Sequence, residues 1–287
     1  MNARAYLHFI PDVMDQLIQF GLWKFGSDHL TFGGVKYFTD GSIQGFTAAL
    51  KEGYHSRPDF NGNLLYNQKK IKDLISKYHK MGIQIAVHTN GDAASEAAIS
   101  SFESAIKKYG AKELHHMLIH AQMVSDSQLE RMKACGITPS FFSRHIEVWG
   151  DRHYTTFIGP QRTNRLNPAG SCVRLQMPFS LHVDTPVLPV TVLGSMHAAV
   201  NRISSGGRLL GADQRISPRQ ALQAYTVYAA SCCGGENDRG KIEPGRLADF
   251  VLLDKNIEQT DPLKLRDIQV KMTICGGNIV FQRKGSQ

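Results

Sequence analysis

The chain has 287 residues, of which 42% are hydrophobic and 20% are charged, an ordinary globular composition that excludes a mainly disordered protein. Lysine and arginine (33) outnumber aspartate and glutamate (25), giving a net charge of +8, but no aromatic platform or recognition motif accompanies them, so nucleic acid is not predicted as a partner. No apolar run approaches the roughly 20 residues of a membrane helix, and the five cysteines lack the spacing of a zinc ribbon or a disulfide framework. We therefore expect a cytoplasmic protein with reduced thiols and no membrane contact.

Short apolar runs of strand-like pattern alternate with helix-like segments along most of the chain. The predicted strands are Ala5–Ile10, Gly34–Phe38, Ile83–His88, Met117–His120, Ile137–Phe142 and Phe179–Asp184. The predicted helices are Val13–Phe25, Lys69–Met81, Asp92–Tyr109, Ser125–Cys135, Pro189–Ser204 and Ser217–Cys233, with long loops at 39–63 and 143–165. Ser125 and Ser217 are suited to cap the helices they begin, and Pro218 suits a first helical position.

Strands separated by helices predict a parallel sheet with right-handed crossovers, as in a doubly wound α/β fold or a (β/α)₈ barrel. The pattern changes from Gly240, where Ala248–Leu253, Met272–Cys275 and Asn278–Gln282 are predicted strands and Gly276-Gly277 a hairpin turn. We therefore predict an α/β domain over residues 1–239 and a small all-β part over residues 240–287.

Four predicted strands end in a potential metal ligand or base: Lys36, His88, His120 and Asp184. Alternation along each strand places these residues opposite the large apolar side chains, the face that points into the lumen of a barrel. His88 and His120 are 32 residues apart, and His120 and Asp184 are 64 apart, close to one and two barrel units of about 31 residues each. Because imidazole and carboxylate groups suit Zn²⁺ and related divalent ions, we predict a metal site where the strands end.

Several segments, in this order, resemble the amidohydrolase superfamily, in particular the amidohydrolase family 3 branch that includes N-substituted formamide deformylase. The matching segments are Gly34–Ser42, Ala86–Asp92, Ile119–Gln122, His145–His153, Ser180–Val187 and the closing segment Gly240–Phe250. The resemblance covers the chain from about residue 30 to its end, and it implies a (β/α)₈ metal-dependent hydrolase barrel with part of a small β-sandwich.

The resemblance also implies roles for individual residues. Lys36, once carboxylated, would bridge two metal ions; His88 and His120 would bind the more exposed ion; and Asp184 would bind the other and act as general base for the bridging water. His145, His153 and His182 would line the substrate pocket. The implied cofactor is one or two divalent ions, Zn²⁺ above all, and the implied partner is a small-molecule substrate. We also expect the loop at 143–165 to fold over the site.

The sequence departs from the superfamily in one respect, because it contains no His-x-His pair, which the superfamily carries on its first barrel strand. Residues 5–10 look like the third barrel strand. The resemblance therefore implies an incomplete barrel that covers only the C-terminal part of the family's fold. We expect a truncated product, one half of a split enzyme or a fragment, with a separate N-terminal half or a homo-oligomer as a possible partner.

The function that these observations favour is hydrolysis of a non-peptide C–N bond in an amide, formamide or cyclic amide by a metal-activated water. Two alternatives stay open at this point. One is a non-catalytic, truncated or regulatory domain of the same fold, which metal content would distinguish. The other is a metal-dependent esterase or lactonase, which substrate profiling would distinguish.

Overall fold

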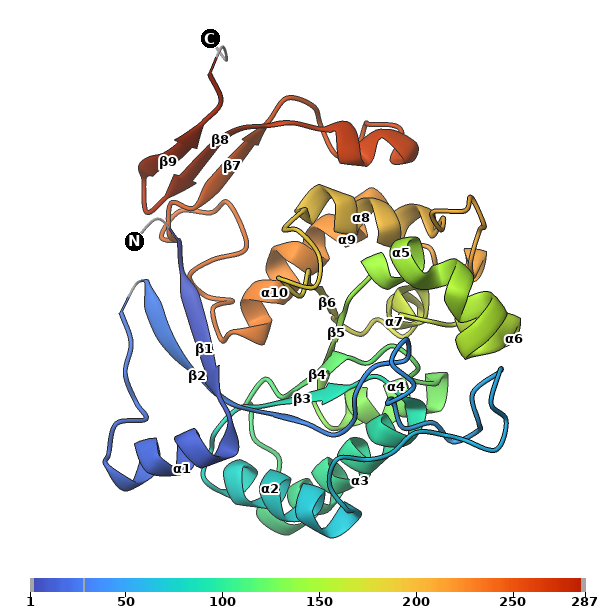
Figure 1. The fold of residues 1–287 in the computed structure, drawn as a ribbon. Helices are drawn as coiled ribbons and strands as arrows, with labels where there is room; N and C mark the ends of the chain where they lie inside the picture. The colour runs from blue at the N-terminus through green and yellow to red at the C-terminus, as the bar shows by residue number, and fades with distance from the viewer. Residues whose placement is uncertain (1–2, 28, 285–287) are drawn as a thin grey trace.

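The computed structural model describes residues 3–27 and 29–284 and contains two sheets (Figure 1). The larger is a six-stranded parallel sheet in the order β1-β2-β3-β4-β5-β6, so every strand pairs with its neighbours in the chain. Its strands are β1 (Ala5–Phe9), β2 (Leu30–Phe38), β3 (Ile85–Thr89), β4 (Met117–His120), β5 (Thr138–Phe141) and β6 (Ser180–Leu181). The sheet curls like half of a barrel, which confirms the predicted parallel α/β architecture.

Helices on the outer face of the sheet form the crossovers and bury the main core. They include α1 (Pro11–Gln19), α2 (Gln68–Lys80), α3 (Asp92–Tyr109) and α4 (Asp126–Ala134). Ile85 and Val87 of β3 are fully buried in the same apolar cluster as Ile75 of α2 and Phe102 of α3. Ala86 and His88 have the opposite parity on this strand: Ala86 is buried in a separate cluster with Met117 and Cys232, and the His88 ring lies against that of His120, in agreement with the predicted alternation.

Local capping explains where two of the predicted helices begin. The Ser125 hydroxyl accepts from the Gln128 N–H while the Gln128 side chain accepts from the Ser125 N–H, forming a capping box at the start of α4. Ser217 and Gln220 repeat this arrangement at the start of α9 (Pro218–Tyr225), with Pro218 at the first helical position. Both caps were predicted from the sequence.

Three of the predicted elements differ from the structure in ways that matter for the fold or the site. The first helix ends at Gln19 rather than at residue 25, because Gly21 adopts a φ of +70° just beyond the C-cap. The last long helix is divided at Thr226 into α9 and α10 (Val227–Cys232). The sixth strand contains only Ser180 and Leu181, so His182 and Asp184 lie in the loop that follows it, before α8 (Val192–Asn201).

The segment predicted as a loop at 143–165 is mostly helical, so that prediction was wrong. It contains α5 (Arg144–Arg152), a five-residue π-helix η1 (His153–Phe157) and α6 (Gly159–Asn164), and α7 (Ala169–Arg174) follows. Ile146 and Phe157 are buried in a second apolar cluster with Leu50 and Tyr54 of the 39–63 segment. Burial against another segment stabilises these short helices, a contribution that local sequence pattern does not reveal.

The smaller sheet is antiparallel, with β7 (Phe250–Leu253), β8 (Val270–Cys275) and β9 (Asn278–Gln282) in that order. Gly276 and Gly277 both have positive φ and form the predicted hairpin turn between β8 and β9. Arg4, just before β1, forms two hydrogen bonds with the Asp249 carboxylate at 2.6 and 3.0 Å, so the N-terminal part contacts this sheet (Figure 1). Within residues 3–27 and 29–284 no helix is both long and apolar enough to cross a membrane.

Candidate metal centre

Side chains from three strands and the loop after β6 meet at the C-terminal ends of the parallel sheet. His120 is the last residue of β4, His88 is the penultimate residue of β3, and the β3–β4 register pairs Thr89 with His120. The ring centroids of His88 and His120 are 4.6 Å apart, and those of His120 and His182 are 4.9 Å apart. Parallel pairing of neighbouring strands thus aligns residues that are far apart in the chain.

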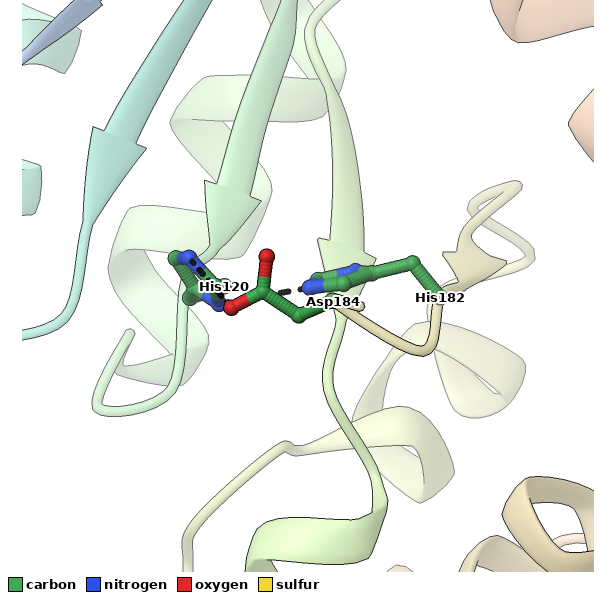
Figure 2. A group of neighbouring side chains, drawn as sticks. All are labelled: His120, His182 and Asp184. Carbon is green, nitrogen blue, oxygen red and sulfur yellow. Dashed lines mark hydrogen bonds and ion pairs between the residues drawn. The ribbon is translucent and has the colours of Figure 1, made fainter. Parts of the chain in front are cut away.

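His120, His182 and Asp184 form a group whose ligand atoms all lie within 4.8 Å of one another (Figure 2). His182 Nε2 is 3.2 Å from His120 Nδ1, and Asp184 Oδ2 is 3.9 Å from His120 Nε2. Two nitrogens bound to one Zn²⁺ lie about 3.3 Å apart. His182 Nε2 and His120 Nδ1 have this spacing, which is also that of a hydrogen bond, while Asp184 faces the other ring nitrogen of His120. The other nitrogen of His182, Nδ1, lies 2.9 Å from Ser140 Oγ, a contact that fixes the ring orientation.

Burial keeps these imidazoles neutral, the form that binds a metal ion. It lowers the pKa of His120 well below its usual value, and the nearby His182 and His88 lower it further. It lowers the pKa of His182 to about 3, with a smaller effect from the charge of Lys36. The neutral donors are therefore available near neutral pH.

His88 and Lys36 lie beside this group without belonging to it. His88 Nε2 is 3.0 Å from both the Gly41 carbonyl oxygen and Asn90 Nδ2. Lys36 Nζ lies 5.4 Å from the centre of the Phe38 ring, which in turn is 4.8 Å from the His88 ring. The structure thus brings His120 and Asp184 together, places His88 against His120, and puts Lys36 on the same side of β2 as Phe38.

His145 and His153 lie on α5 and η1, separated from the metal group by Phe142. The Phe142 ring is 5.5 Å from the His182 ring and 4.9 Å from the His145 ring. Both histidines are buried, and His145 Nδ1 is 3.4 Å from His153 Nε2. Burial lowers the pKa of His153 to about 3, and its Nδ1 has no hydrogen-bond partner among the described residues.

Asp40 organises the loops around His88. Its buried carboxylate accepts hydrogen bonds from the N–H groups of Ala49, Asn90 and Gly91 at 2.8–3.0 Å. Burial raises the pKa of Asp40 to about 7, although these hydrogen bonds oppose the rise. Asp92 instead accepts from the N–H groups of Lys51 and Ala93 in the first turn of α3.

His182 is the residue whose place the sequence did not predict. The resemblance to the superfamily implied that His182 lines the substrate pocket. In the structure, His182 belongs to the group of side chains that can hold a metal ion. The sequence did indicate that His182 and Asp184 lie on the same side, because they are two residues apart in the predicted strand from Phe179 to Asp184. Spacing could not show that the loop after Leu181 turns both side chains toward His120 (Figure 2).

Comparisons with known proteins agree with this geometry. The sequence profile of the amidohydrolase family matches residues 2–281. The Bacillus subtilis protein YtcJ is 30% identical over 98% of this chain and 52% of its own length, and N-substituted formamide deformylase of Arthrobacter pascens is 26% identical over 88% of this chain and 46% of its own. The solved structure of a metal-dependent hydrolase of Pyrococcus horikoshii superposes with a TM-score of 0.80 at 29% identity, covering 90% of this chain and 52% of that one.

The chain therefore spans about half the length of these relatives. The profile match runs over nearly the whole chain and includes His88 and His120 on β3 and β4 and Asp184 in the loop after β6. The fold, the order of the motifs and the clustered ligand atoms agree with that match. The chain belongs to the amidohydrolase family.

Proposed function

We propose that this chain carries the metal centre of a hydrolase that cleaves a non-peptide C–N bond in an amide, formamide or cyclic amide. The observation that carries the proposal is the group of His120, His182 and Asp184 at the C-terminal ends of the strands. Family membership supports hydrolysis, and a relative named for the deformylation of N-substituted formamides supports the C–N bond.

The donor set suits a divalent ion, and Zn²⁺ in particular, because it combines two neutral imidazoles with one carboxylate. We assign Lys36, in carboxylated form, and His88 as further ligands on the neighbouring strands, where they would help to hold a second ion. Such ions, when bound, would lower the pKa of a water molecule toward neutrality and polarise the carbonyl group of the substrate.

The residues of the chain would then handle the proton and the substrate. The Asp184 side chain is 35% exposed, so its carboxylate can accept the proton of the attacking water and deliver it to the leaving nitrogen. His145 and His153, with the Phe142 ring, would line the substrate pocket, since His153 Nδ1 has no hydrogen-bond partner among the described residues and could pair with a substrate. Asp40 and Asn90 would hold the loops that position His88.

The proposal is tested by metal analysis and by hydrolysis assays on the purified chain, using an N-substituted formamide, a simple amide and the matching ester. We expect Asp184→Asn to lower kcat on the amides by about 10²–10⁴-fold, the usual range for loss of a general base. His182→Asn should lower the metal content, since it removes a ligand. Asp73→Asn, on the exposed surface of α2, serves as the matched control and should change neither value.

Two outcomes would contradict the proposal. A chain that holds no divalent metal after incubation with Zn²⁺, Mn²⁺ or Co²⁺ and hydrolyses none of the substrates would indicate a non-catalytic domain. A chain that cleaves the ester but neither amide would indicate a metal-dependent esterase.

A further inference from the structure

A cavity of about 460 Å³ is lined partly by residues that are near those of the metal centre in the sequence. Two arginines and only one carboxylate line it. Arg144 follows the C-terminal end of β5, and the run from Val190 to Gly194 follows Asp184 and begins α8. Arg266 enters from the 3₁₀-helix η3 (Pro262–Asp267) of the C-terminal part. The loop after β6 therefore carries both Asp184 and part of the cavity wall, and β5, whose Ser140 contacts His182, leads to Arg144.

The charges in the cavity do not cancel. Glu147 Oε2 accepts from Arg144 Nε at 3.2 Å, and Glu147 Oε1 accepts from Arg266 Nη1 at 3.1 Å. One carboxylate is thus shared by two guanidinium groups, which leaves an excess of one positive charge in a partly buried setting. The Arg144 side chain is 17% exposed and that of Arg266 is 44% exposed, and a charge that is partly shielded from water, as on Arg144, attracts a counter-ion more strongly than one on the open surface.

The arginines also have hydrogen-bond donors to spare. Besides Glu147, Arg144 donates from Nη1 to Thr191 Oγ1 at 3.0 Å, and Arg266 Nη2 lies 2.6 Å from His197 Nδ1. A guanidinium carries five N–H donors, so most of those on Arg144 and Arg266 have no partner among the described residues. Guanidinium N–H pairs match the geometry of a carboxylate.

The rest of the cavity wall is apolar. Val190 and Val192 are 68% and 42% exposed, and Leu193 and Val270 line the same space. The first turn of α8 also lines it, and the N–H groups at a helix start favour an anion. A ligand that complements both the two arginines and the apolar side chains carries one carboxylate beside a short aliphatic group.

We propose that this cavity is a subsite for the carboxylate of the substrate, with Arg144 and Arg266 as its recognition residues. The inference deepens the proposed function and rests on it, because it assigns the scissile C–N bond to an amide that also bears a carboxylate and a small aliphatic group. Glu147 acts as the internal counter-ion that holds both guanidinium groups in place until the carboxylate arrives.

The test is binding of isocaproate, a branched aliphatic carboxylate with no bond to hydrolyse, followed by calorimetry or by protein NMR. We expect isocaproate to bind the 287-residue chain, with or without prior EDTA treatment, and its uncharged analogue isocaproamide to bind about tenfold more weakly or worse. Arg144→Gln and Arg266→Gln should each weaken isocaproate binding by about tenfold, which corresponds to about 1.4 kcal/mol.

Two further variants distinguish the subsite from general charge effects and from misfolding. Arg219→Gln removes a highly exposed arginine outside the cavity and should leave binding unchanged. Glu147→Gln removes the competing carboxylate while it keeps the size of the side chain, so isocaproate should bind more tightly than to the unaltered chain. A variant that merely failed to fold could not produce tighter binding.

The inference is overturned if isocaproate and isocaproamide bind alike, if Arg219→Gln weakens binding as much as Arg144→Gln, or if EDTA abolishes binding, since the carboxylate would then sit on the metal. These outcomes are separable from failure of the proposed function. If isocaproate binds but the chain has no hydrolase activity, the proposed function is contradicted and the carboxylate subsite is supported. If the chain hydrolyses neutral amides efficiently but does not bind isocaproate, the subsite is contradicted and the proposed function is supported.

Discussion

Single residues at the metal centre have unusual backbone conformations. His120, Ala121 and Asp184 have φ values of 71°, 44° and 55°, in the left-handed region that non-glycine residues seldom adopt. Each costs on the order of 1 kcal/mol or more, so the surrounding structure must enforce it. Two of these residues belong to the candidate ligand group, which agrees with the tendency of backbone strain to collect at functional sites.

A second pair of histidines, His79 and His116, has a purely structural arrangement. The Ile85 N–H donates to His116 Nδ1 at 3.1 Å, which leaves His116 Nε2–H to donate to His79 Nδ1 at 3.0 Å. His79 Nε2–H then donates to the Gly110 carbonyl at 2.8 Å. Every ring nitrogen is satisfied only while both rings are neutral, and burial lowers the pKa of His116 to about 3.

This arrangement predicts a loss of stability in acid. The folded pKa of His116 lies below the unfolded value of about 6.5, so its stabilising contribution is complete above pH 6.5 and is lost as the pH falls toward 3. The comparison protein is His116→Asn, which keeps an acceptor for the Ile85 N–H but cannot be protonated in this range. As the pH is lowered, we expect the free energy of unfolding of the unaltered chain to decrease more steeply than that of His116→Asn, by up to about 1.4 kcal/mol per pH unit. Urea unfolding between pH 6 and 4 measures this difference, and equal slopes would contradict it; at pH 8 the slopes should coincide.

At the scale of elements, one buried arginine joins the end of α8 to the segment before α7. The guanidinium of Arg202, 2% exposed, donates to four backbone carbonyls and to no carboxylate. Its acceptors are Leu210 at 2.6 Å, Leu166 at 2.8 Å, and Asn164 and Asn167 at 3.3 Å each. Burial lowers the pKa of Arg202 to about 9, although the charge of Asp213 opposes the fall.

Removal of this guanidinium should be costly. We expect Arg202→Leu to lower the free energy of unfolding by about 3–5 kcal/mol, because it leaves several buried carbonyl groups without donors. Arg219→Leu, at a highly exposed position, should change the value by less than about 0.5 kcal/mol. Urea unfolding at pH 8 measures both variants. A loss below about 1 kcal/mol for Arg202→Leu would mean that water replaces the guanidinium.

At the scale of the whole molecule, the parallel sheet is open among the described residues. Strands β1 and β6 each pair with one neighbour only, and the relatives are about twice as long as this chain. Open sheet edges expose unpaired N–H and C=O groups and favour association with another polypeptide. The sequence also contains no His-x-His pair, the motif that its resemblance to the superfamily implies as ligands of one metal ion.

These observations predict a gain of function on complementation. By itself, the 287-residue chain should bind metal weakly and hydrolyse amides slowly. A polypeptide that covers the relatives' remaining half and carries a His-x-His pair should raise both metal content and activity when supplied in trans. The same polypeptide with both histidines changed to alanine is the matched control, and should bind without restoring activity. Two tightly bound ions and full activity in the lone chain would refute this prediction.

The sequence by itself determined the parallel sheet, the small antiparallel sheet and the strands that carry His88 and His120, because strand alternation and capping residues act locally. His88 and His120 could be assigned to strand ends from parity, and Ser125 to a cap from its position. Only the tertiary structure decided that residues 144–164 are mainly helical, since these short helices depend on burial against residues 39–63. It alone placed His182 beside His120 and joined Arg144 to Arg266 through Glu147, because such contacts join residues that are distant in sequence and leave no local periodicity.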